Sequence, residues 1–361
     1  MIITFKSFNK QLMYRKTLRF ILISLGFLFF SEANAAVQLT VDIYRTKQVS
    51  LNIIKKEFRS EFKNIADILS SSDGLANPKN LSRFAEANLR IISGINKMGD
   101  FAYVQISPIM YPNDKIIHIT IDVVDRKDEK RLSYFLKKPN QNVSDPDHII
   151  DKWMDYQKIG FSSVFKEKKF PQYKSCPAYH CLFGFDNPKL KKYEKIFTDL
   201  VPKNQTTLIE ILRNDKDENK RAAASYLLAH IRNRDLLIDT LIPSIMDSSE
   251  IVRNNVMRVL GMTLQNGSSE SFPIDYVIKA LDFPATTDRN KAMLIMLALS
   301  KNPVNSNYII HQSSNELLDE LRLLQPNVHK LSYSILKQIS GKSYQERDYL
   351  AWNSWVNQIQ T

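Results

Sequence analysis

Apolar and polar residues alternate from residue 37 onward with a period of two, which is the pattern of a β-strand with one buried face. The stretch VQLTVDIYR places its apolar side chains on one side, namely Val37, Leu39, Val41 and Ile43. Apolar residues then recur at helical spacing over residues 48–69 and again over about 81–98, where Gly99 is typical of a helix end. Two more alternating stretches follow, FAYVQISPIMYP and KIIHITIDVVD. The order β-α-α-β-β predicts a small α+β domain over residues 36–130.

This order resembles a POTRA-type domain, the β-α-α-β-β module of bacterial envelope proteins. The residues that carry the resemblance are Gly99, Phe101 and Val104, which match a G-x-F-x-x-V pattern before the second strand, together with the closing strand ITIDVVD. The chain departs from the family after the first strand, where TKQ stands in place of a Gly-Asn turn, and no barrel strands follow. The resemblance implies an exposed sheet edge that could take a peptide by strand addition.

Residues 131–203 are predicted to form a linker followed by a helical cap. The beginning of this segment is polar and carries two prolines, and apolar residues at helical spacing then predict helices over about 146–165 and 189–200. Between the two helices lies CPAYHC, which contains Cys176 and Cys181. A stack of helix pairs needs its first apolar face covered, and we expect this segment to cover it. Its aromatic members are Tyr179, Phe183 and Phe185.

From residue 204 the apolar pattern repeats as pairs of helices. In each unit an apolar helix ends at an Asp and the next helix carries an Arg six or seven residues later. These positions are Asp215 and Arg221, Asp247 and Arg253, and Asp282 and Arg289. The arginines recur after 32 and then 36 residues, a spacing typical of stacked helical repeats. A fourth unit over 315–341 keeps the apolar pattern but lacks the Arg.

The period, the turn Asp and the second-helix Arg resemble HEAT repeats, including the HEAT-like repeats of phycobilin lyases. The chain also closes as many HEAT-repeat chains do, with a Gly, an aromatic residue and an Asp before the pair Trp352 and Trp355, which we expect to cover the last apolar layer. The resemblance implies an all-α solenoid of about four helix pairs over residues 204–361, after the α+β domain. In such a solenoid each turn Asp accepts from backbone N–H groups and pairs with the Arg of a neighbouring unit.

The first 35 residues have the three parts of a secretory signal. A basic segment precedes an apolar run of 11 residues, and Ala33-Asn34-Ala35 provides an A-x-A cleavage site after Ala35. The apolar run is too short to cross a bilayer as a helix, which needs about 20 residues. Translation from Met13 instead of Met1 would give a signal of more ordinary length. We therefore expect a periplasmic or secreted protein without a transmembrane segment once the signal is removed.

The excess of basic residues is mild. Lys and Arg exceed Asp and Glu by 12, and cleavage after Ala35 would remove five cations and one acid, which lowers the net charge to +8. This charge indicates solvated helix faces, with an anionic envelope surface as a further candidate contact. Nucleic acid is not expected as a partner outside the cytoplasm.

Only Cys176, His180 and Cys181 form a cluster of residues with the chemistry of a catalytic or metal site. Export to an oxidising compartment favours a disulfide between the two cysteines. Two thiolates and an imidazole are also zinc ligands, although the usual C-x2-C spacing of zinc and thiol-redox sites is absent. The leading hypothesis is a non-catalytic, exported scaffold or adaptor that binds a protein or peptide in the bacterial envelope, with no catalytic, cofactor or metal residues. The alternative is a thiol-redox or metal-dependent enzyme centred on this cluster; a lyase for a prosthetic group would rest on repeat analogy alone.

Overall fold

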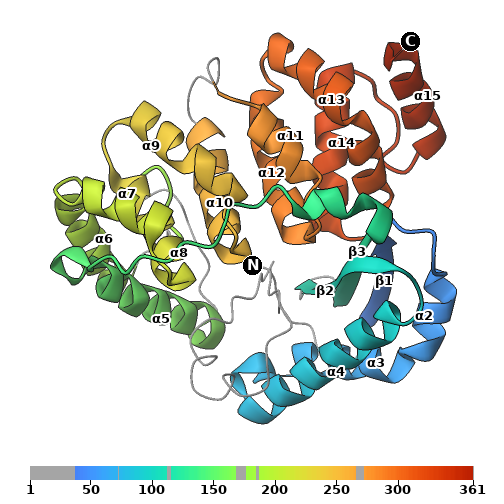
Figure 1. The fold of residues 1–361 in the computed structure, drawn as a ribbon, viewed down its shortest axis with the longest axis horizontal. Coiled ribbons are helices and arrows are strands. Elements are labelled where there is room, and N and C mark those ends of the chain that lie inside the picture. The colour runs from blue at the N-terminus through green and yellow to red at the C-terminus, as the bar shows by residue number, and fades with distance from the viewer. Residues whose placement is uncertain are drawn as a thin grey trace.

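The computed structural model describes residues 37–71, 73–111, 115–167, 176–183, 187–265 and 272–360. The predicted signal segment, residues 1–35, lies outside them. The described chain begins with a three-stranded sheet and its helices and continues as a helical region to the C-terminus (Figure 1). Among the described residues, no helix combines the length and apolar character needed to cross a bilayer.

The N-terminal module has the predicted α+β organisation, with one difference. Its elements are β1 (Gln38–Tyr44), α2 (Leu51–Glu57), α3 (Arg59–Ser70), α4 (Pro78–Asn96), β2 (Phe101–Tyr111) and β3 (Ile116–Asp125). The first predicted helix is divided into α2 and α3 at Phe58, whose φ of −105° and ψ of 26° interrupt the helical backbone. The sheet order is β1-β3-β2, with β1 parallel and β2 antiparallel to the central strand β3.

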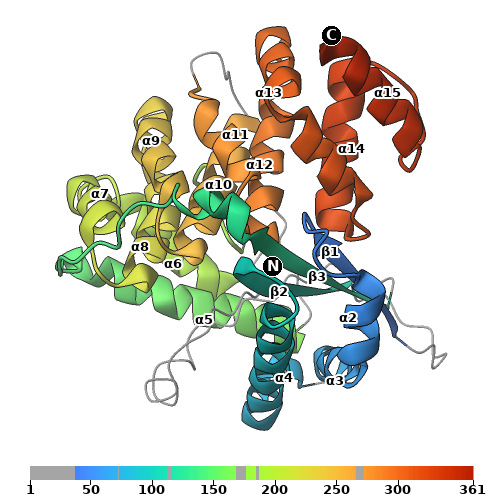
Figure 2. The same cartoon turned by 45° about the vertical axis from the view of Figure 1, so that its right-hand side comes forward.

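The two faces of the sheet have different neighbours. Alternate residues of β3 point to opposite sides: Ile119 and Ile121 belong to the apolar core shared with α2, α3 and α4, whereas Thr120 and Asp122 are buried on the other side. That other side faces the helical region, so the sheet lies between α2–α4 and the helices near the C-terminus (Figures 1 and 2). Both faces of this sheet are therefore covered by the chain itself.

In the helical region, helices that follow one another along the chain pack together in pairs. Its helices are α5 (Ile149–Glu167), α6 (Pro188–Leu200), α7 (Gln205–Asn214), α8 (Glu218–Leu227), α9 (Arg234–Leu241), α10 (Glu250–Gln265), α11 (Asp275–Leu281), α12 (Thr286–Leu299), α13 (Pro303–Arg322), α14 (Pro326–Ser340) and α15 (Tyr349–Gln360). Helices α8, α10, α12 and α14 pack side by side in a row, and α7, α11 and α13 each pack against the next helix of that row. Their apolar side chains form one continuous core from α5 to α15.

Residues 131–145, predicted as part of a linker, are held along the helical region. After the 3-10 turn η3 (Arg126–Leu132), the segment crosses α10 and α8 as the green trace of Figure 1. Leu136 N–H donates to the Met246 carbonyl at 2.7 Å, and Gln141 exchanges backbone hydrogen bonds with the turn after α7, at 3.1 and 2.7 Å. The segment is thus bonded to the ends of two successive units.

Candidate functional site

The arginines of the repeated units are buried and link one unit to the next. Arg221 donates through Nε and Nη2 to the carboxylate of Asp247 at 2.9 and 2.8 Å, and through Nη1 to the Asp215 carbonyl at 2.8 Å. Arg253 repeats this geometry, with Nη1 donating to the Asp247 carbonyl at 2.8 Å and Nε and Nη2 to Asp288 at 3.0 and 2.7 Å. Each Arg therefore bonds its own turn and the following unit. Such planar, paired donors suit carboxylate recognition.

The turn aspartate predicted for the third unit, Asp282, does not pair with the arginine of the preceding unit. Asp288, not Asp282, receives Arg253, because the turn of this unit is longer and Asp288 lies in the first turn of α12. Asp282 is partly exposed and instead pairs with Arg45 at 2.5 Å and with Arg131 at 3.2 Å, both from the N-terminal part of the chain. Arg289 contacts acids outside its own turn, as described next.

A buried ion pair joins the sheet to the helical region. Arg289 Nη2 lies 2.9 Å from Asp122 Oδ1, and both side chains are fully buried. Asp122 also accepts from Thr286 N–H at 3.0 Å, from the Thr286 hydroxyl at 2.6 Å and from the Ser107 hydroxyl at 2.9 Å. Arg289 Nε donates to Glu320 of α13 as well. The aspartate is thus surrounded by donors, which is the condition for burying a charge at low cost.

Tyr44 of β1 completes this cluster. Its ring lies under the Arg289 guanidinium, 3.6 Å from the centroid, as in a cation–π contact. Burial raises the pKa of Tyr44 well above its ordinary value, and the nearby Glu320 raises it further. Burial also raises the pKa of Glu320, which Arg289 beside it opposes. Nothing in the sequence pattern singled out Asp122; an Asp between Ile and Val residues in a predicted strand is the signal that could have indicated it.

We call the contact surface between the sheet and helices α12–α14 the seam. At its partly exposed rim, Arg45 lies 2.5 Å from Asp282, 3.4 Å from Glu316 and 3.5 Å from Asp319. Two further hydrogen bonds cross it, from Leu324 N–H to Asp42 Oδ2 at 2.6 Å and from Asn327 N–H to the Tyr111 hydroxyl at 3.2 Å. The N-terminal module thus occupies this side of the helical row.

The two cysteines lie at disulfide distance. The Sγ atoms of Cys176 and Cys181 are 2.14 Å apart and the Cα atoms 5.6 Å apart. Tyr179 between them holds the loop on the helical region, since its N–H donates to the Ala229 carbonyl and its hydroxyl to the Arg232 carbonyl, both at 3.0 Å. Paired in this way, the two sulfurs are not thiolate ligands for a metal ion.

His180 is buried beside the ring of Tyr226. Its ring lies 5.6 Å from that of Tyr226, and burial lowers its pKa to about 3. His230 lies 5.6 Å from the ring of Phe197, and burial lowers its pKa to about 4. Both imidazoles are therefore neutral at pH 7. The expected covering role of Tyr179 and Phe183 fits this aromatic cluster, whereas Phe185 lies outside the described residues.

The two C-terminal tryptophans pack on the last helices. Trp352 is fully buried, with its ring 5.1 Å from Tyr344 and 6.0 Å from Tyr333, and its indole N–H donates to the Gln345 carbonyl at 3.0 Å. Trp355 lies 6.1 Å from Trp352 and is 8% exposed. The exposed edge of Trp355 borders an open groove.

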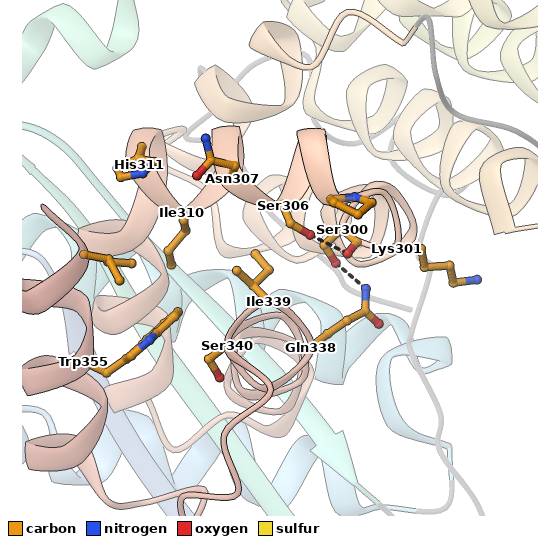
Figure 3. Close-up of a pocket in the computed structure, with 12 residues that line it drawn as sticks. Ser300, Lys301, Ser306, Asn307, Ile310, His311, Gln338, Ile339, Ser340 and Trp355 are labelled. Atoms are coloured by element: carbon orange, nitrogen blue, oxygen red, sulfur yellow. Dashed lines mark hydrogen bonds between the residues drawn. The ribbon is translucent and has the colours of Figure 1, made fainter.

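This groove, called the terminal groove below, lies between α13, α14 and α15 and encloses about 570 Å³ (Figure 3). Its apolar part is formed by Ile310 of α13, Ile339 of α14, and Trp355 and Ile359 of α15. Figure 3 shows Ile310 and Ile339 pointing toward each other from facing helices, with Trp355 to one side. Its volume lies in the range of small-ligand and side-chain pockets, roughly 300–1,000 Å³.

The other end of the terminal groove is polar. Gln338 Nε2 donates to the Ser300 hydroxyl at 2.6 Å and to the Leu297 carbonyl at 3.3 Å, and the Ser306 hydroxyl donates to the Ser300 carbonyl at 2.7 Å (Figure 3). These bonds hold the end of α12, the start of α13 and α14 together. The polar end is therefore fixed before any partner binds.

Comparison with protein-family models, curated proteins and solved structures finds no match to the chain. Function must therefore be inferred from the residues themselves. The twelve residues that line the terminal groove include one lysine, one histidine and no acid. The lining combines a mostly buried apolar floor with a polar rim, as interfaces between proteins do.

One exposed cluster has metal-ligating side chains. Asp145, His148 and Asp151 bring one oxygen or nitrogen each within 4.8 Å of one another at the start of α5. The carboxylate of Asp145 already accepts from Ile150 N–H at 2.9 Å and Asp151 N–H at 3.1 Å. Its position at the helix start and these bonds account for the cluster as a cap.

Proposed function

We propose that the protein is a non-catalytic interaction scaffold of the bacterial cell envelope, in which a POTRA-like module is joined to a HEAT-like α-solenoid. Export through the N-terminal signal would bring it into the periplasm or beyond, and a cysteine pair at disulfide distance suits such a compartment. The observation that carries the proposal is the terminal groove. It is open, has an apolar floor, and is built from three helices that the chain fixes in place.

Rigidity supports this role. The Arg–Asp contacts bond successive units, and the seam bonds the module to α12–α14, so that the binding surface is ordered before a partner arrives. A preorganised surface loses less conformational freedom on binding than a mobile one. In this proposal the buried Arg–Asp pairs maintain the shape of that surface.

The outer edge of β1 is a second surface for a partner. In the described part of the chain this strand pairs only with β3, and five of its seven residues are partly exposed. An unpaired strand edge can accept an extended peptide through backbone hydrogen bonds. The module could therefore contribute a contact of its own, close to the seam.

Site-specific photo-crosslinking in the native envelope tests the proposal. A benzophenone amino acid at Asn307, an exposed residue of the terminal groove, should give a discrete protein adduct. The same crosslinker at Ile53, which is 57% exposed on α2, serves as a control away from the groove. An Asn307 adduct no stronger than that of Ile53 would argue against a partner in the groove.

Point variants are better suited to this test than deletion of the module. Removal of residues 36–130 would expose the fully buried Arg289 and break its pair with Asp122. Loss of one partner of a buried ion pair typically costs about 3–5 kcal/mol. Partner loss after deletion would therefore be hard to distinguish from unfolding.

A further inference from the structure

We propose that the terminal groove binds an acidic amphipathic peptide segment of another envelope protein, with an apolar side chain against Ile339 and Ile359 and a carboxylate near Lys301. This inference rests on the proposed scaffold function and specifies the chemistry of the partner. It follows from the incomplete cover of the last helix pair and from the distribution of charge around it.

The last helix, α15, covers only part of the apolar surface of α13 and α14. At its C-terminal end Gln360 Nε2 lies 2.5 Å from the Ser314 hydroxyl of α13, and Trp352 fills the space beside Tyr333. Between these contacts the groove remains open beside Ile339 and Ile359, which are partly exposed, whereas Ile310 is 4% exposed and lies at its floor. An apolar side chain placed there would extend the existing core contact of Trp355 and Ile359, so the surface continues an established packing layer.

No acidic side chain is found among the described residues that line the groove. The residues of α13 and α14 that line the groove come from segments 289–315 and 321–345, which contain no Asp or Glu. The described part of α15 has no charged side chain. Lys301 and His311 line the groove and are exposed. Two more lysines are near the end of α14: Lys337 lies in its last turn, and Lys342 comes two residues after it ends. A carboxylate on the partner would therefore meet the Lys301 ammonium without a competing acid in the lining.

The polar end of the groove agrees with a peptide as occupant. α13 begins there with Asn302 as its cap, whose side chain accepts from Val304 N–H at 2.8 Å and Asn305 N–H at 3.4 Å. The positive end of the first part of this helix, which is interrupted at Ser313 (φ −143°, ψ 16°), favours a negative charge nearby, typically by about 0.3–1 kcal/mol. Because these N–H groups already have partners, the interaction with the ligand would be electrostatic and sensitive to salt.

Selection of short peptides displayed on phage tests the inference. The target is the full chain purified with its disulfide intact, and clones are counter-selected against Asn307→Trp, which fills the groove from an exposed position. Clones that require the open groove should be enriched in Leu, Ile or Phe together with Asp or Glu. Their affinity should fall about 10-fold with Lys301→Glu and rise again when the acid of the peptide is exchanged for Lys. Lys56→Glu, on exposed α2, is the matched charge control and should change affinity less than 2-fold.

The outcomes separate the two proposals. Groove-dependent clones that are uncharged or basic, or that bind Lys301→Glu equally well, would overturn the acidic partner but leave the scaffold function standing. Clones that bind wild type and Asn307→Trp equally would overturn both. Sedimentation with phosphatidylglycerol vesicles provides a separate arm: lipid binding lost in both Lys301→Glu and Asn307→Trp would assign the groove to an anionic membrane and contradict the peptide. Circular dichroism of each variant confirms that the helices are retained.

Discussion

Acidification from pH 7.5 to pH 5 should loosen the helical end that contains His180 and His230. Both imidazoles are buried, at 4% and 7% exposure, and burial lowers their pKa values to about 3 and about 4. In the unfolded chain a histidine titrates near pH 6.5. At pH 7.5 the side chains are neutral in both states. As the pH falls below 6.5, the unfolded chain binds protons that the folded chain excludes, so the free energy of unfolding decreases until the folded-state pKa is reached.

The size of this effect follows from the two pKa values. At pH 5 the solution is about 1.5 pH units below the pKa of an unfolded histidine and still above both folded-state pKa values. Protonation therefore stabilises the unfolded chain by about 2 kcal/mol for each histidine. The two together give about 4 kcal/mol, a large part of a stability of 5–15 kcal/mol that is typical of proteins. Glu194 acts in the opposite direction, because burial raises its pKa and the folded state therefore takes up its proton first.

Hydrogen exchange resolves this prediction along the chain. Amides of α5 and α8, which enclose the aromatic cluster, should lose about 30-fold to 1,000-fold in protection between pH 7.5 and pH 5 after correction for intrinsic rates. Amides of α4, a helix without a histidine, serve as the internal reference and should change far less. In the double variant His180→Phe and His230→Phe most of the difference should disappear, while Glu194 is unchanged. A change of less than 3-fold in α8, or an equal change in α4, would refute the reasoning.

Three further results are expected. Asp122→Ala should lower the free energy of unfolding by about 3–5 kcal/mol, because Arg289 keeps its buried charge without this partner. Asp122→Asn should lower it less. A Tm of the alanine variant within 1 °C of wild type would contradict the buried pair. Trp352→Ala should cost about 3–5 kcal/mol in denaturant unfolding, and Leu350→Ala on the same helix, where the side chain is 84% exposed, should be close to neutral; equal effects would show that Trp352 does not cap the core. Thiol titration of the denatured, unreduced protein should find no free thiol, and replacing both cysteines with serine should cost about 2 kcal/mol because the closed loop is short; free thiols or stoichiometric zinc would favour the thiol or metal enzyme instead.

Much of the local structure could be predicted because it depends on near neighbours in the chain. The helix expected over 189–200 is α6, Pro188–Leu200, and its start is marked by Asn187, whose side chain accepts from Lys189 N–H at 3.0 Å. The three strands lie within a residue or two of their predicted ranges because their apolar periodicity is regular. Phe58 interrupts a helix that periodicity alone predicted as continuous, since it packs against Phe62 and Gly94 in the core.

Sequence by itself also determined that Arg221 and Arg253 lie beside turn aspartates, because these residues are near one another along the chain. Only the tertiary structure decided which carboxylate each Arg meets. Asp288 replaces Asp282 because one turn is longer, and Asp122 reaches Arg289 across 167 residues because β3 turns that side chain toward α12. The same holds for the neutral histidines and for the terminal groove. Ion pairing, burial and shape depend on which distant surfaces exclude water from one another, and no local pattern of residues specifies that contact.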